Sequence, residues 1–135
     1  GAMSSGEEGA LIEAAQAARE RAYAPYSAYR VGSALQTRSG RIFTGCNVEN
    51  ASYGLTICSE RVALGKAVSE GERDFEVLAI CASGAPAPCG ACRQVLHEFS
   101  PGLVLLLIDP RKEQSVKVDL SVLLPQAFQQ SSLDA

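Results

Sequence analysis

The chain has 135 residues, of which 47% are hydrophobic and 20% are charged, and its formal net charge is −3. These proportions are typical of one folded domain with a sizeable core, and they exclude an intrinsically disordered chain. Twelve basic residues are scattered among fifteen acidic ones, which argues against nucleic acid as a ligand because binding a phosphate backbone requires clustered cations.

The first half of the chain predicts a helix followed by two strands. Apolar residues recur at helical spacing over residues 8–22, and Pro25 follows that helix. Strands are predicted at 31–37 and 41–46, and the short glycine-containing turn between them favours an antiparallel hairpin. Residues 47–57 are predicted to form a loop.

The second half predicts strands and helices in alternation. The predicted elements are a helix at 58–69, a strand at 75–82, a short helix at 90–99, strands at 103–108 and 116–118, and a turn or helix at 120–127. The uniformly apolar run at 103–108 is typical of a central strand that is covered on both faces. Alternation of this kind indicates an α/β fold with a layered sheet.

The ends of the chain and its cysteines suggest where the protein works. Gly1 and Ala2 precede Met3, so we expect residues 1–7 to be a tag remnant and a disordered N-terminus, and residues 8–135 to form a single domain. No secretory signal opens the chain, and no apolar run is long enough to cross a bilayer. The five cysteines are an odd number, which argues against a disulfide framework. We therefore expect a cytoplasmic protein without a membrane partner.

Three cysteines form a candidate metal site. Cys89 and Cys92 open one predicted helix, and Cys58 opens another. A helix start offers unpaired N–H groups and a positive dipole end, which lower the pKa of a thiol and favour the thiolate that binds zinc. Only three protein ligands leave a fourth position open, which is typical of a catalytic zinc site. Glu60 is not needed as a ligand, so its carboxylate can transfer protons.

The pattern Cys58-x-Glu60 followed by Pro88-Cys89-x-x-Cys92 matches the signature of zinc deaminases. Over roughly residues 10–130, the chain resembles the small homotetrameric zinc-dependent cytidine deaminases of pyrimidine salvage. The matching segments are 23–27, 31–32, 45–54, 56–61, 88–96 and 123–128.

The resemblance implies a fold and a reaction. The fold would be a three-layer α-β-α arrangement with a five-stranded mixed sheet. The reaction would convert cytidine and deoxycytidine to uridine and deoxyuridine plus ammonia, through attack of zinc-bound hydroxide at C4 of the base with Glu60 as the proton shuttle. One zinc ion per chain would be bound by Cys58, Cys89 and Cys92, and Arg61 would hydrogen-bond a ligand sulfur.

The resemblance also implies a set of residues that contact the nucleoside substrate: Tyr29, Asn47, Glu49, Tyr53, Ser59, Ala87 and Phe128. Asn47 and Glu49 would hold the ribose hydroxyls, Tyr29 would line the base pocket, and the Ala87 carbonyl would accept a hydrogen bond from the amino group. Phe128 would reach into a neighbouring subunit's site, so that the active site would need the homotetramer.

Three residues depart from the usual family pattern. Tyr29 stands where the family usually has Phe, and Ser33 and Ser59 stand where it usually has Ala. The additional hydroxyl of Tyr29 would affect the size of the base pocket and its tolerance of substituents at C5 of the base. The Ser59 hydroxyl either touches substrate or caps its helix.

Three other functions fit parts of the pattern. A deaminase of a cytosine-containing antibiotic such as blasticidin S would use the same zinc chemistry, although the pair Asn47 and Glu49 favours an ordinary nucleoside. A non-catalytic zinc-binding interaction module would close the site with a fourth protein ligand. A thiol redox protein would use Cys89 and Cys92 as a reversible disulfide and bind no metal.

Overall fold

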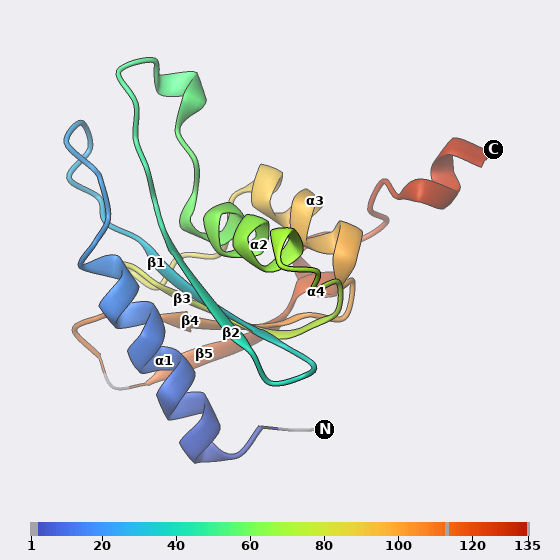
Figure 1. Cartoon of the computed structure of the whole chain (residues 1–135), viewed down its shortest axis with the longest axis horizontal. Coiled ribbons are helices and arrows are strands. Elements are labelled where there is room, and N and C mark those ends of the chain that lie inside the picture. The colour runs from blue at the N-terminus through green and yellow to red at the C-terminus, as the bar shows by residue number, and fades with distance from the viewer. Residues whose placement is uncertain (1–2, 113, 135) are drawn as a thin grey trace.

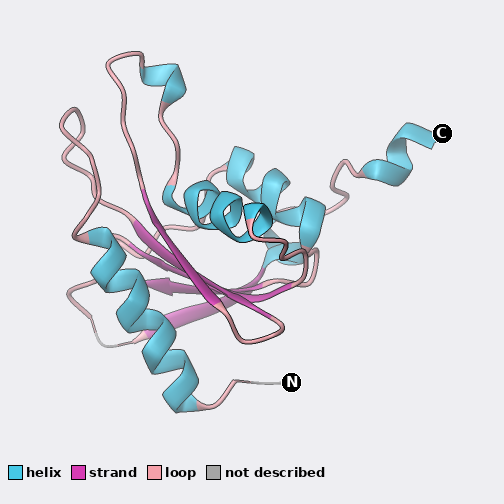
Figure 2. Ribbon diagram, in the orientation of Figure 1, coloured by secondary structure: helices cyan, strands magenta, loops and turns pink. Residues whose placement is uncertain are grey.

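Five strands form one mixed sheet with helices on both faces in the computed structural model, which describes residues 3–112 and 114–134 (Figures 1 and 2). The helical segments are α1 (Ser5–Arg19), the 3₁₀ turn η1 (Tyr53–Leu55), α2 (Ser59–Ser69), α3 (Gly90–Phe99), α4 (Leu120–Leu123) and the 3₁₀ segment η2 (Gln130–Asp134). The strands are β1 (Gly32–Thr37), β2 (Ile42–Cys46), β3 (Phe75–Cys81), β4 (Val104–Ile108) and β5 (Ser115–Asp119). The predicted α/β class and its five strands are confirmed.

The strand order is β2-β1-β3-β4-β5. The predicted hairpin is confirmed, because β1 pairs antiparallel with β2 and places Ser33 opposite Gly45. Strand β1 also pairs antiparallel with β3, and β4 with β5, whereas β3 and β4 are parallel. The parallel pair requires a crossover, which α3 provides. The loop that leaves β3 therefore leads directly into α3.

Side chains alternate between the two faces of the sheet, and each face has its own core. On β3, Val77 and Ala79 pack in the cluster that includes Leu11 of α1, whereas Leu78 and Ile80 pack in the cluster that contains residues of α2 and α3. Helix α1 thus covers one face, and α2 and α3 cover the other (Figure 1). The predicted three-layer α-β-α arrangement is confirmed.

The first helix begins earlier than the sequence analysis predicted. It runs over Ser5–Arg19 rather than 8–22, and Ser4 is its N-cap. The Glu7 backbone N–H donates to Ser4 Oγ (3.1 Å), and the Ser4 N–H donates to Glu7 Oε1 (3.3 Å), which forms a capping box. The expectation of disorder over 1–7 is therefore wrong for residues 4–7, because this cap satisfies the free N–H groups of the first turn. Residues 1 and 2 lie outside the described part.

Gly45 allows the start of α2 to lie directly on the sheet. A Cβ built at this position would collide with the Ser59 carbonyl oxygen and would lie 2.6 Å from the backbone nitrogen of Ala63. Both atoms belong to the helix backbone and cannot rotate away. The absence of a side chain at Gly45 thus sets how closely the first turn of α2 approaches β1 and β2.

We expect Gly45→Ala to lower the free energy of unfolding by about 1–3 kcal/mol or more, because α2 must shift to relieve the overlap. Urea denaturation measures this change. Gly65→Ala is the matched control on exposed α2 surface, where an added Cβ meets nothing within 4 Å; we expect it to raise stability by about 0.5–1 kcal/mol. Equal effects of the two substitutions would contradict the proposed close approach.

Candidate metal centre and adjoining pocket

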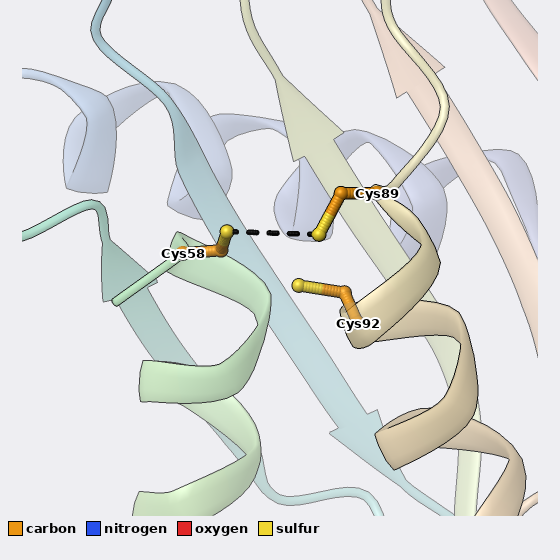
Figure 3. Close-up of side chains that lie close together, drawn as sticks. All are labelled: Cys58, Cys89 and Cys92. Atoms are coloured by element: carbon orange, nitrogen blue, oxygen red, sulfur yellow. Dashed lines mark hydrogen bonds between the residues drawn. The ribbon is translucent and has the colours of Figure 1, made fainter. Parts of the chain in front are cut away.

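Three thiols converge from the starts of two helices (Figure 3). Cys58 is the N-cap of α2, Cys89 is the N-cap of α3, and Cys92 lies in the first turn of α3. Their Sγ atoms all lie within 4.8 Å of one another, and the Cys58 and Cys89 sulfurs are 3.8 Å apart. Neither N-cap side chain bonds to its own helix backbone, so both sulfurs remain available to a shared ion.

The electrostatics of this cluster favour a bound cation. Hydrogen bonds from Cys92 and from Arg61 lower the pKa of Cys58 to about 5. The hydrogen bond to Cys58 and burial raise the pKa of Cys92. A dication would neutralise thiolates crowded together in this way, and soft sulfur ligands suit zinc. The three residues present thus fit one Zn²⁺ ion.

The metal cluster has three members within the described residues. Structural zinc sites usually have four protein ligands, whereas catalytic sites keep one position open. Arg61 lies beside the cluster, and its Nη2 donates to Cys58 Sγ at 3.6 Å. Its Nε is buried and has no hydrogen-bond partner among the described residues. Arg61 therefore places positive charge against a ligand sulfur.

Glu60 lies in the first turn of α2, two residues after Cys58. Its side chain is almost fully buried, and Ser59 Oγ donates to Glu60 Oε1 at 2.8 Å. Burial raises the pKa of the Glu60 carboxyl above its usual range, and the hydrogen bond from Ser59 partly opposes this shift. A carboxyl group with a raised pKa accepts a proton more readily than an exposed one, which suits proton transfer.

A pocket of ≈ 350 Å³ opens beside the cysteines and Glu60. Its lining residues are Ser27, Tyr29, Val31, Asn47, Glu49, Thr56, Cys58, Ser59, Glu60, Ile80, Pro86, Ala87 and Cys89. The volume falls in the range typical of small-molecule sites. The structure therefore brings two of the three predicted metal ligands, the predicted acid and most of the predicted substrate contacts to one cavity.

Four of the predicted site residues lie outside this lining. Cys92 is fully buried, and Arg61 contacts the pocket residue Cys58 through its Nη2. Tyr53 lines a neighbouring hollow with Tyr26 and Glu49. Phe128 is 60% exposed and belongs to the C-terminal segment, which extends away from the body of the chain (Figure 1).

Two hydrogen bonds made by the Asn47 side chain hold the pocket segment at residues 29–31. Its Oδ1 accepts from the Val31 N–H (2.9 Å), and its Nδ2 donates to the Tyr29 carbonyl (2.8 Å). An amide nitrogen has two protons, so one donor of Asn47 remains for a ligand. The same side chain thus fixes the segment that leads into β1 and still offers a polar group to the cavity.

Ser27 is a pocket residue that the sequence analysis did not single out. Its Oγ donates to Glu49 Oε2, while the Tyr26 and Ser27 N–H groups donate to Glu49 Oε1. These bonds, led by the one from the Ser27 hydroxyl, hold the pKa of Glu49 below its usual range. Ser27 belongs to the matched segment 23–27, but its contact with Glu49 is not visible in the sequence because twenty-two residues separate them.

Two contacts anchor the loop between β3 and α3. The Tyr29 hydroxyl donates to the Ser83 carbonyl at 2.6 Å, so it is engaged by backbone. Asp109 follows β4, is 3% exposed, and accepts from the Gly84 N–H at 3.0 Å. The sequence analysis missed Asp109, although an acidic residue directly after a buried strand is a recognisable signal at a sheet edge. The loop carrying Ala87 is thereby held in place.

We expect Asp109→Asn to lower the melting temperature at neutral pH. Hydrogen bonds and charge from Arg111 hold the pKa of Asp109 well below its usual range, so the carboxylate stabilises the fold above the unfolded-state pKa of about 3.9 and this stabilisation is lost as the pH falls. Thermal unfolding across that range should therefore show the largest deficit at neutral pH and a smaller one in acid. Asp119→Asn, at an exposed position without a side-chain cap bond, is the control. A deficit that is independent of pH would contradict this assignment.

Among metal sites, a three-cysteine set with an open position and a nearby glutamate that is not a ligand defines the zinc-dependent deaminases. The chain belongs to the cytidine and deoxycytidylate deaminase family, whose zinc-binding region matches residues 6–108.

Relatives and solved structures agree with this family. A cytidine deaminase from Sporosarcina psychrophila is 45% identical over 125 residues, 91% of this chain and 92% of its own length. A cytidine deaminase from Halalkalibacterium halodurans is 48% identical over 120 residues, which are 87% of this chain and 91% of its own length. The crystal structure of cytidine deaminase from Burkholderia pseudomallei has a TM-score of 0.86 and 49% identity, and the match covers 93% of this chain and all of that one.

More distant similarity bears on the alternative antibiotic substrate. A blasticidin-S deaminase from Bacillus cereus is 26% identical over 110 residues, which are 74% of this chain and 77% of its own length. This identity is well below the 45% and 48% of the cytidine deaminases from Sporosarcina psychrophila and Halalkalibacterium halodurans. None of the helices in the described part of the chain combines the length and apolar character that a bilayer span requires.

Proposed function

We propose that this chain is a zinc-dependent cytidine deaminase that hydrolyses cytidine and deoxycytidine to uridine and deoxyuridine with release of ammonia. One observation carries the proposal: the buried Glu60 and two of the three converging thiols, Cys58 and Cys89, line one pocket with Asn47 and Glu49. The metal end of this pocket suits hydrolysis at a ring carbon, and its polar end suits a sugar. The family relationship supports the same reaction.

The pocket residues would bind and orient the nucleoside. Glu49 is ionised and held rigid by the turn at residues 26–27, so it can accept hydrogen bonds from ribose hydroxyls. The free N–H of Asn47 can donate to the same sugar. The base would lie among Tyr29, Ile80 and Pro86, where the Ala87 carbonyl can accept a hydrogen bond from the exocyclic amino group.

Glu60 would move the protons of the reaction. Bound zinc supplies a Lewis acid that lowers the pKa of a water molecule. Glu60 would accept a proton from that water and deliver it to N3 of the base as oxygen adds to C4. It would then transfer the remaining proton of the same water to the amino group, and the C4–N bond would break to release ammonia. Atoms balance, because water and cytidine give uridine and ammonia.

Charge in the pocket favours a nucleoside over a nucleoside monophosphate. Among the described lining residues there is no Lys or Arg, and Glu49 is anionic. A phosphate usually needs cationic or clustered N–H donors. We therefore propose cytidine and deoxycytidine as substrates, and we expect the corresponding monophosphates to be poor ones.

The test is a substrate panel with metal analysis on the same protein. The panel contains cytidine, deoxycytidine, deoxycytidine monophosphate and blasticidin S, and deamination is followed by the fall in ultraviolet absorbance. We expect turnover of the two nucleosides with about one zinc ion per chain. If zinc-loaded protein deaminates only blasticidin S, the substrate is the antibiotic and not a nucleoside. If zinc is bound but no substrate is turned over, a non-catalytic zinc-binding module is favoured.

The assembly and compartment belong to the same proposal. Tyr53, Leu55, Phe128 and Leu133 are each more than half exposed, and they lie on two segments that project from the body (Figure 1). Burial of these side chains in a homotetramer, with Phe128 completing a neighbour's site, would remove that apolar surface from water. All five cysteines are free, which suits a cytoplasmic enzyme of pyrimidine salvage. Light scattering coupled to size-exclusion chromatography tests the tetramer.

A further inference from the structure

Two buried serines form a chain of hydrogen bonds that ends on Glu60. Ser33 Oγ of β1 and Ser59 Oγ of α2 are 2.6 Å apart, and Ser59 Oγ lies 2.8 Å from Glu60 Oε1. Both serines are 0% exposed. The contact spans the interface between sheet and helix at the place where Gly45, opposite Ser33 in the sheet, lets α2 approach most closely.

The direction of each bond follows from the geometry and from the number of hydroxyl protons. Ser59 Oγ donates its single hydroxyl proton to Glu60 Oε1. Ser59 then has no proton left for Ser33, and Ser33 must donate to Ser59. The order of donation is thus Ser33 to Ser59 to Glu60, and each hydroxyl proton is used within the protein.

This order leaves no donor on Ser59 for a ligand. Although Ser59 lines the pocket, its hydroxyl is committed to the carboxylate beside it. A carboxylate has about four acceptor sites, so the bond from Ser59 leaves capacity on Glu60 for substrate and water. The bond also limits the rotation of the Glu60 side chain, whose position decides whether a proton can reach the base.

We infer that Ser59 is a positioning residue that holds the Glu60 carboxylate in its reactive orientation, and that Ser33 acts only by orienting the Ser59 hydroxyl. This inference rests on the proposed function and adds two residues to its machinery. A mispositioned general acid–base slows the chemical step without changing the groups that bind ribose. The expected signature is therefore a loss in kcat at an unchanged KM.

The test is a double-mutant cycle with cytidine as the substrate. Ser59→Ala should lower kcat about tenfold, the rate equivalent of one hydrogen bond to a charged group, with KM and zinc content unchanged. Ser33→Ala should lower kcat less, and the double variant should match Ser59→Ala alone because Ser33 acts through Ser59. Ser59→Thr, which keeps the hydroxyl, should recover kcat. Ser69→Ala, at the far end of α2, is the control for loss of a serine hydroxyl.

A crystal structure of Ser59→Ala supplies a readout that does not depend on activity, and we expect the Glu60 carboxylate to leave its present position. Additive losses of kcat in the double variant would overturn the inference, and so would a wild-type kcat in Ser59→Ala with Glu60 unmoved. In either case, wild-type protein that deaminates cytidine would still uphold the proposed function. Wild-type protein that does not deaminate cytidine would instead defeat the proposed function. The position of Glu60 in the variant crystal would then decide the inference by itself.

Discussion

Glu60→Gln is expected to lower kcat for cytidine by about 10²–10⁴-fold, the usual contribution of a general acid–base group. Glutamine keeps the size of the side chain and can still accept the hydrogen bond from Ser59, but it cannot take a proton from water and pass it on. The cysteines are untouched, so zinc content and the circular dichroism spectrum should match those of the wild type. Steady-state kinetics together with metal analysis measure both halves of this prediction.

The matched control is Glu13→Gln, which removes a carboxylate from an exposed position on α1, on the other face of the sheet. We expect it to leave kcat unchanged. Near-wild-type turnover of Glu60→Gln would remove Glu60 from the mechanism. A loss of zinc in that variant would point to a ligand role instead of proton transfer.

Cys89→Ala is expected to reduce bound zinc from about one ion per chain to nearly none and to abolish turnover, because two thiolates bind the metal far more weakly than three. Cys89 is the exposed member of the set, so its truncation leaves no cavity in the core that could explain the loss. The melting temperature of the wild type should fall when a chelator removes the metal. That of Cys89→Ala should respond little to the same chelator.

Cys46→Ala is the control, because Cys46 is a half-buried thiol that bonds only weakly to the Arg21 carbonyl and lies outside the metal cluster. It should keep zinc, turnover and the response to chelator. Full zinc content in Cys89→Ala would contradict the three-ligand assignment and would require a different set of ligands.

The sequence alone was sufficient for the fold class, the five strands and the metal ligands. Helix and strand periods are local properties, and Gly71 and Pro101 mark the ends of elements within a few residues. The ligand set was predictable for a similar reason. Cys58 and Glu60 on one side, and Cys89 and Cys92 on the other, are short patterns at helix starts, where backbone geometry fixes the direction of the first side chains.

The start of α1 could have been predicted from the sequence, although the predicted helix began three residues too late. Ser4 and Glu7 form the Ser-x-x-Glu pattern of a capping box. The adjoining tag-like residues led to their exclusion from the fold. The helix forms there because local hydrogen bonds suffice, whatever the origin of the residues before it.

Contacts between distant residues required the tertiary structure. The sequence identified Ser59 and Tyr29 as departures from the family pattern but left the roles of their hydroxyls open. Only the packing of α2 on β1 brings Ser33 to Ser59, and only the meeting of the 25–31 segment with the loop after β3 brings Tyr29 to Ser83. A hydroxyl bonds to whichever partner the fold brings within about 3 Å, and that partner is set by register and layer spacing. The candidate site was therefore recognisable from local motifs, whereas the hydrogen-bond partners of Ser59 and Tyr29 are set by tertiary packing.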